Sequence, residues 1–254
     1  MKGILEYSQG ETIIHRLNPL SKMIVAFLIC LSSFANNNIY FTIGIIAVNL
    51  LIAYLAQIFD KALSLLITLF KIGIVLFLLQ VFFIRTGNIL LTLPFNLYIT
   101  DIGLKFSILL VLRLVGATMP LVIILTVTRM SDLTNVMVQK LHIPYKYTFA
   151  FTTALRFIPI FENEMKGIIE AQTARGVEFD TKNPVKKLKL VLPLCVPLLI
   201  SSVKRIEGSA ISAELRGFNL RSRDSGYKTY GFIGMDYIAM LFSILLLLTS
   251  IIIL

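Results

Sequence analysis

The stretch ALSLLITLFKIGIVLFLLQVFFI (62–84) decides the fold class, because Lys71 is its one charged residue and most of the others are apolar. A helix needs about 20 apolar residues to cross the hydrocarbon core of a bilayer. The chain has 254 residues, of which 57% are hydrophobic, and its mean hydropathy is +0.85. These values predict an all-α integral membrane protein and argue against a soluble domain.

Outward from this stretch, further apolar runs bring the expected membrane spans to about five. They cover residues 21–36, 39–58, 62–84, 104–128 and 230–254. The connection 85–103 contains turn residues and alternating apolar residues, which predict a small hairpin or a segment lying on the surface. We expect three parts: residues 1–128, with an N-terminal cytoplasmic segment and four spans; residues 129–229, with cytoplasmic or interfacial coupling helices; and residues 230–254, the last span.

Charge is concentrated between the fourth and last spans. Residues 129–228 carry 16 Lys and Arg and 9 Asp and Glu, out of 24 and 14 in the whole chain. Basic segments beside membrane spans tend to stay in the cytoplasm. We therefore expect a multi-pass protein of the cell membrane, with the N-terminus and this block inside and the C-terminus outside. Nothing in the block resembles a nucleic-acid-binding module, so no nucleic-acid partner is expected.

The residues most often used for metal binding and catalysis are isolated along the chain. Cys30 and Cys195 lie far apart in apolar runs, and His15 and His142 have no partners at ligand spacing. This pattern predicts no disulfide, no metal site, no catalytic residue and no bound cofactor.

Two basic residues fall inside predicted spans, Lys71 in the third and Arg113 in the fourth. Charges at such depth are costly and often mark a transport pathway. No acidic residue lies deep in any span to pair with them or to relay protons, which argues against a proton-coupled carrier. Local structural pairing or snorkelling is therefore the preferred interpretation.

Prolines are expected to divide the charged block into helices. The pair Ser131-Asp132 caps a first helix that Pro144 should end. Pro159 should kink or break the next one, and Pro193 and Pro197 should break the third.

The third helix is rich in small residues. Gly208 with Ser212, and Ser209 with Ala213, have the spacing that lets two helices approach closely. We expect two long arms that cross near their middles.

Both arms end alike, in AQTARGVEF (171–179) and SAELRGFNL (212–220). An arginine near a helix C-terminus favours the helix dipole, and a following glycine supplies a left-handed cap, so either end alone is ordinary. The repetition of Arg-Gly on two arms suggests a further role. A guanidinium fits an acidic pocket with a bidentate geometry that lysine cannot match.

Three segments of the chain resemble the transmembrane (T) component of energy-coupling factor (ECF) transporters, the ABC-type importers of vitamins and transition-metal ions in prokaryotes. They are IIHRLNPLSKM (13–23), LRFIPIFENEMKGIIEAQTARGVEF (155–179) and PLLISSVKRIEGSAISAELRGFN (197–219). Asn18 stands where the family usually has Asp, Leu20 where it has Arg, and Leu215 where Ala is common. Any salt bridge that those first two residues make in the family is therefore absent here.

The resemblance implies a non-enzymatic coupling subunit. It would link two cytoplasmic ABC-type ATPases to a membrane-embedded substrate-binding subunit, for uptake of a vitamin or a transition-metal ion such as cobalt. If these positions have the role that the matching motifs have in the family, the ATPases would dock on Ala174, Arg175 and Gly176 of one tip and on Leu215, Arg216 and Gly217 of the other.

Two other functions are weaker. An intramembrane enzyme using His15 or His142 as base would need a catalytic cluster, and none is present at suitable spacing. A stand-alone secondary transporter or channel would show matched broken spans near the membrane midplane, and the paired motifs fall elsewhere.

Overall fold

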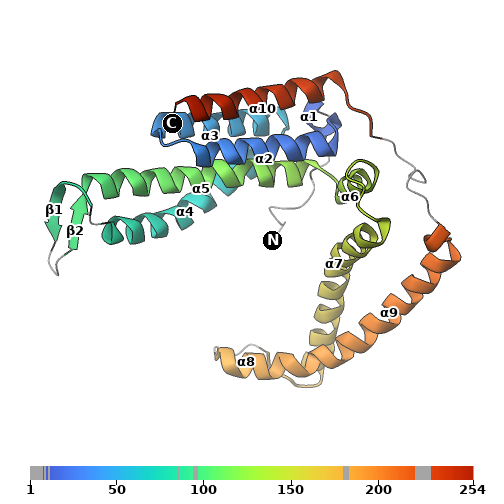
Figure 1. Cartoon of the computed structure of the whole chain (residues 1–254). Coiled ribbons are helices and arrows are strands. Elements are labelled where there is room, and N and C mark those ends of the chain that lie inside the picture. Colours follow the sequence, from blue (N-terminus) through green and yellow to red (C-terminus); the bar gives the residue numbers. More distant parts are fainter. Residues whose placement is uncertain are drawn as a thin grey trace. The chain divides into compact units, whose positions relative to one another are not determined.

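The computed structural model describes residues 8, 10, 12–84, 86–93, 97–179, 183–220 and 230–253, with only the backbone of 90–93, 97, 98, 184 and 187. Contacts within the chain divide it into two compact units (Figure 1). The first holds the described residues up to Val136 together with 230–253, and the second runs from Met137 to Leu220.

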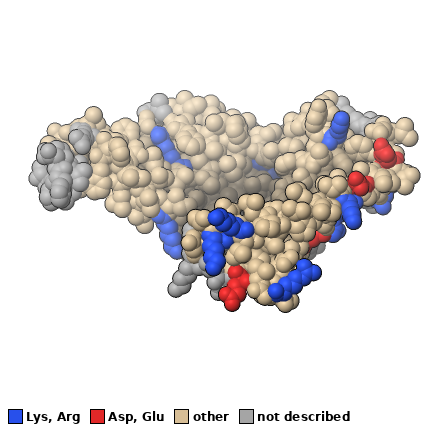
Figure 2. Space-filling view, turned by 90° about the horizontal axis from the view of Figure 1, so that it is seen from below, with Lys and Arg blue, Asp and Glu red and all other residues tan. Residues whose placement is uncertain are grey.

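The first unit is a bundle of apolar helices. All five segments expected to span the membrane are helical: α2 (Pro19–Ala35), α3 (Ile39–Leu55), α4 (Phe59–Phe83), α5 (Asp101–Val127) and α10 (Gly234–Ile252). By length and composition α4, α5 and α10 can cross a bilayer, and α2 and α3 are shorter apolar helices of 17 residues each. The chain is thus an all-α membrane protein, as predicted. Figure 2 shows that uncharged residues cover most of the face in view.

A small hairpin is the exception to the helical fold within the described residues. Strand β1 (Ile89–Leu93) pairs antiparallel with β2 (Leu97–Thr100), which confirms the hairpin alternative for the connection 85–103. The hairpin leads directly into α5, whose first turn is capped when the Thr100 hydroxyl accepts a hydrogen bond from the Gly103 amide at 3.1 Å.

Helix α5 lies at the centre of the bundle and packs on α2, α3 and α4. Its residues Val115, Met119 and Ile123 are buried against Ala53 and Ala62. Glycine permits close approach of α4 to α5, since a Cβ on Gly73 would lie 2.6 Å from Val111 Cγ1. Burial of each large apolar side chain contributes roughly 1.5–3 kcal/mol relative to exposure in water.

Polar side chains join the bundle helices internally. The Asn36 amide donates to the Ser250 carbonyl at 3.0 Å, and the Ser250 hydroxyl donates to the Ser32 carbonyl at 2.8 Å, which ties α2 to α10. Arg113 Nη2 donates to the Asn36 carbonyl at 2.7 Å and to Asn37 Oδ1 at 2.8 Å. The local pairing predicted for Arg113 is confirmed. Lys71 is exposed on α4 and has no such partner among the described residues.

Two short helices complete the first unit. Helix α1 (Ile13–Arg16) precedes α2, and α6 (Met130–Gln139) follows α5 and reaches the division between the units. Helix α6 ends earlier than Pro144, in a turn where His142 adopts a left-handed conformation with φ of 59°. Pro144 instead occupies the N-cap of the next helix.

The second unit consists of α7 (Tyr145–Ala174), α8 (Pro184–Val191), a 3₁₀ turn η1 (Leu192–Leu194), α9 (Cys195–Leu215) and a 3₁₀ turn η2 (Phe218–Leu220). The expected break at Pro193 is confirmed by η1. The breaks at Pro159 and Pro197 are wrong. Pro159 lies inside a continuous α7, and Pro197 lies in the first turn of α9, where a backbone N–H has no intrahelical acceptor to lose.

Helices α7 and α9 run antiparallel, because the start of α7 contacts the end of α9. The Phe149 and Phe218 rings lie 4.8 Å apart between centroids, and Tyr145 also contacts Phe218. Near the middle of both helices, Glu164 accepts a hydrogen bond from Ser201 and pairs with Arg205 at 3.5 Å. The arms therefore meet at two places. The prediction that another helix of the chain approaches α9 closely at Gly208 is wrong, because a Cβ on Gly208 would meet nothing within 4 Å.

Candidate docking sites at the helix tips

The first candidate site is the C-terminal end of α7. Arg175 is the C-cap, and Gly176 follows with a left-handed φ of 90°. The Gly176 amide donates to the Thr173 carbonyl at 2.9 Å and the Val177 amide to the Gln172 carbonyl at 3.1 Å. This pair of bonds is the Schellman cap, which requires the left-handed residue. A Cβ on Gly176 would meet nothing within 4 Å, so the backbone conformation alone accounts for glycine here.

The second candidate site is the C-terminal end of α9. Arg216 is the C-cap, and Gly217 follows with φ of 72°. The Gly217 amide donates to the Glu214 carbonyl at 2.9 Å, and the chain then turns into η2. Leu215, beside the arginine, is 85% exposed.

The two arginines adopt nearly the same backbone conformation, with φ and ψ of −86° and 6° at Arg175 and −87° and 13° at Arg216. Helix capping accounts for both glycines. It does not account for the two guanidinium groups, which are exposed and form no ion pair with any described residue. An exposed cation without a partner contributes little to folding, and its side chain is available to a binding partner.

The predicted site residues form two separate tips. Phe218 at the α9 tip contacts Phe149, and Arg175 lies 26 residues farther along α7 (175 − 149). At 1.5 Å per residue of helix, the two tips are separated by about 40 Å. Ala174, Arg175 and Gly176 thus present one surface, and Leu215, Arg216 and Gly217 present another.

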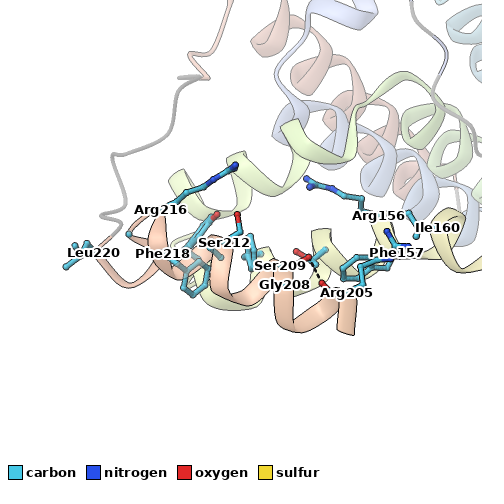
Figure 3. A pocket seen from close by; sticks show the side chains of 15 residues that line it. Arg156, Phe157, Ile160, Arg205, Gly208, Ser209, Ser212, Arg216, Phe218 and Leu220 are labelled. Carbon is cyan, nitrogen blue, oxygen red and sulfur yellow. Dashed lines mark hydrogen bonds between the residues drawn. The ribbon is translucent and has the colours of Figure 1, made fainter. Parts of the chain in front are cut away.

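A groove lies beside the second tip, between α7 and α9, with a volume of about 1130 Å³. Arg216 from α9 and Arg156 from α7 extend over it from opposite ends, with their guanidinium groups directed toward each other (Figure 3). The small residues Gly208, Ser209 and Ser212 line the α9 side. Sequence reasoning missed Arg156, because nothing in a single sequence relates it to a residue so distant along the chain.

An apolar stripe runs along α8 and α9. Its members recur at intervals of three or four residues along α8, the turn η1 and α9, and each is more than half exposed. They are Val185, Leu188, Leu192, Val196, Leu199 and Val203. A continuous exposed apolar surface of this kind marks contact with a protein partner or a membrane.

The histidines have structural partners. His15 Nδ1 and the Thr12 hydroxyl are 2.7 Å apart, and His15 Nε2 lies 3.1 Å from the Ser8 carbonyl. His142 is exposed in a turn, with Nδ1 3.0 Å from the Lys140 carbonyl. Within the described ranges no three His, Cys, Asp or Glu residues are placed to hold a metal, and Cys30 and Cys195 are free thiols.

The segment 13–23 joins the N-terminal region to the last helix. The Asn18 amide donates to Asp236 Oδ1 at 2.9 Å, and the Asn18 side chain accepts from the Leu20 amide at 3.0 Å as N-cap of α2. Asn18 thus caps the helix without a charge of its own. Nearby, the Tyr230 hydroxyl donates to Asp132 at 2.9 Å. Burial, then this bond to a carboxylate, raises the pKa of Tyr230 to about 12.

Comparison with known proteins agrees with this architecture. The family model described as cobalt transport protein, CbiQ, matches residues 10–227. An energy-coupling factor transporter transmembrane protein EcfT from Streptococcus equi subsp. equi is 31% identical, over 94% of this chain and 92% of its own length. The EcfT proteins of Bacillus subtilis (31% identical, 91% and 90% covered) and Streptococcus thermophilus (32%, 84% and 83%) are also similar.

These relatives are transmembrane components of a transport complex that contains other subunits, and they match nearly the whole of this chain. Helices α2 to α5 of the bundle and the two Arg-Gly tips lie within residues 10–227, which the family model matches. The chain belongs to the family of energy-coupling factor transporter transmembrane proteins, the T components.

Proposed function

We propose that this T component is a non-enzymatic scaffold that couples two cytoplasmic ABC-type ATPases to a membrane-embedded substrate-binding subunit. The complex would import a vitamin or a transition-metal ion. The observation that carries the proposal is the pair of similar helix ends, Arg175-Gly176 and Arg216-Gly217, about 40 Å apart by helix length. Their guanidinium groups form no ion pair with a described residue.

Each tip suits an acidic partner surface. Arginine is among the residues most enriched at binding hot spots, and its planar fork holds a carboxylate through two parallel hydrogen bonds. The left-handed glycine fixes the direction in which the chain leaves the helix, so each arginine is held at the end of a rigid helix. Two tips at this separation suit two protein subunits, one at each tip.

Coupling also requires a surface for the substrate-binding subunit, and the apolar stripe of α8 and α9 is the candidate. Its residues are Val185, Leu188, Leu192, Val196, Leu199 and Val203. We propose that the substrate-binding subunit packs on it. A rigid helix pair would then connect ATPase movement at the tips to movement of the substrate-binding subunit. In this arrangement the second unit and the N-terminus lie in the cytoplasm and the C-terminus lies outside.

Co-purification tests the proposal. The chain is expressed with the two ATPases and the substrate-binding subunit of its own genome, and wild type is compared with Arg175→Glu/Arg216→Glu. We expect the double variant to lose both ATPases and to retain the substrate-binding subunit. The matched control is Lys146→Glu/Lys204→Glu, which makes the same charge change at exposed positions on the same two helices.

Equal loss in the control would mean that overall charge, and not the tips, governs assembly. Retention of both ATPases by the arginine variant would reject the tips as docking sites. Substrate uptake by the isolated chain in liposomes, without any ATPase, would instead favour a stand-alone transporter.

A further inference from the structure

A second cavity lies in the first unit, where α1, the start of α2, the end of α5 and the segment before α10 meet. Its volume is about 400 Å³. The residues that matter for its chemistry are Arg16, Lys22, Arg129, Asp132, Tyr230 and Phe232. None of them belongs to the helix tips or to the apolar stripe.

Lys22 lies deep in this cavity and is 4% exposed. Its ammonium group donates one hydrogen bond, to the His15 carbonyl at 3.0 Å, and makes no other among the described residues. An ammonium has three N–H groups, and a buried donor without an acceptor costs roughly 1–3 kcal/mol. Lys22 therefore offers donors to a molecule that enters the cavity.

The described part of the lining is positively charged overall. Among the described lining residues, Arg16, Lys22 and Arg129 are basic and Asp132 is acidic, and Asp132 accepts a hydrogen bond from the Tyr230 hydroxyl at 2.9 Å. Asp236 acts on Lys22 from farther inside, but its oxygens accept the backbone amides of Asn18 at 2.9 Å and Ile233 at 2.7 Å. Because three basic side chains and one carboxylate are present among the described lining residues, the cavity is suited to an anion.

The cavity is at the end of the apolar helices. Helix α2 begins at Pro19, α5 ends at Val127 and α10 begins at Gly234. Lipid phosphates lie just outside the hydrocarbon core, at the depth where membrane-spanning helices end. Phe232, Ile233 and Met235 are exposed beside the cavity and provide an apolar surface for acyl chains.

We propose that this cavity binds a phosphate group, that of an anionic phospholipid headgroup. Lys22 donates to the phosphate oxygens from within, and the exposed Arg16 and Arg129 hold it at the surface. A bound phosphate would join α1, α2 and the end of α5, through Arg16, Lys22 and Arg129. The start of α2 is already linked to α10 by the bond from the Asn18 amide to Asp236. Free inorganic phosphate shares this chemistry, and the experiment separates the two sources.

Native mass spectrometry of the purified chain in detergent measures the binding. The chain is titrated with phosphatidylglycerol and with phosphatidylcholine of the same acyl chains, and phosphatidylglycerol binding is repeated with inorganic phosphate present. We expect phosphatidylglycerol to bind more tightly than phosphatidylcholine. Arg16→Gln should weaken phosphatidylglycerol binding about tenfold, the factor for one charge-assisted hydrogen bond, and Arg16→Lys should restore part of it.

Lys105→Gln is the matched control, because it removes one positive charge from an exposed position near the opposite end of α5. It should leave lipid binding unchanged. Unfolding temperatures of all variants are measured, and Arg16 is exposed, so Arg16→Gln should fold normally.

Two results would overturn the proposal: equal binding of the two lipids, or equal weakening by Arg16→Gln and Lys105→Gln. Displacement of phosphatidylglycerol by inorganic phosphate would support the phosphate site and assign it to free phosphate. Phosphatidylglycerol binding that persists in the presence of inorganic phosphate would assign the site to the lipid headgroup. No ATPase is present in this assay, so its outcome is independent of the docking proposed for the tips.

Discussion

The two units of the molecule use their polar residues in opposite ways. In the bundle, Asn36, Arg113 and Asp236 are bonded to neighbouring helices and lie inside the structure or against its loops. In the second unit, Arg175 and Arg216 are exposed at helix ends without ion pairs among the described residues. The polar groups of the bundle thus stabilise the fold, whereas those at the tips are available to partners.

The same contrast applies to apolar residues. Helix α5 buries Val115, Met119 and Ile123 against neighbouring helices. The stripe on α8 and α9 has no comparable cover from the described residues. A surface that the chain does not bury itself is expected to be buried by a membrane or by another subunit.

The largest expected effect on stability is in the bundle. Asp236 is fully buried, and Asp236→Ala would leave the amides of Asn18 and Ile233 without their acceptor. We expect a loss of about 3 kcal/mol in the free energy of unfolding. Asp60→Ala, in the exposed first turn of α4, should cost at most about 1 kcal/mol. Chemical denaturation in detergent measures both, and a similar cost for the two variants would contradict the contrast between buried and exposed charges.

A smaller effect is expected at the first tip. Gly176→Ala places a Cβ on a residue with φ of 90°, which should cost about 1–2 kcal/mol and disturb the direction of Arg175. Gly167→Ala, in the interior of the same helix and with open space around the new Cβ, should stabilise by about 0.5–1 kcal/mol. Thermal unfolding compares the two. Stabilisation by Gly176→Ala would show that the left-handed cap is not needed.

The smallest effect concerns His15 in the bundle. Burial lowers the pKa of His15 below its ordinary value of 6.5, and the charge of Lys22 lowers this pKa further. The hydrogen bond with the Ser8 carbonyl acts in the opposite direction. Because the fold disfavours the charged imidazole, its stabilising contribution is present above pH 6.5 and is lost as the pH falls through the folded pKa.

The unfolding temperature of the wild type should therefore fall on acidification from pH 7.5 to pH 5. His15→Asn should reduce the size of this fall. An unfolding temperature that falls equally in the two proteins would assign the pH dependence to other groups.

The sequence predicted the membrane helices and the two tips because these depend on local patterns. Long apolar runs define α4, α5 and α10, and Arg-Gly with a left-handed glycine defines each helix end. The hairpin was one of two alternatives that the alternating apolar residues of its segment left open.

The errors arose where the cost of proline depends on position. Pro197 lies in the first turn of α9, where the missing N–H has no consequence. Pro159 removes one hydrogen bond from a helix of 30 residues, and the other bonds maintain α7. The approach of Arg156 to Arg216 over the groove depends on how α7 and α9 pack, which no local pattern reveals.

Site-specific crosslinking tests the central claim most directly. Arg175→Cys and Arg216→Cys are introduced separately into a background with Cys30→Ser and Cys195→Ser, and each is crosslinked in membranes that contain both ATPases. The account predicts that the Arg175→Cys variant links to one ATPase and the Arg216→Cys variant to the other. Links from both positions to the same ATPase, or from neither to any ATPase, would contradict the assignment of one subunit to each tip.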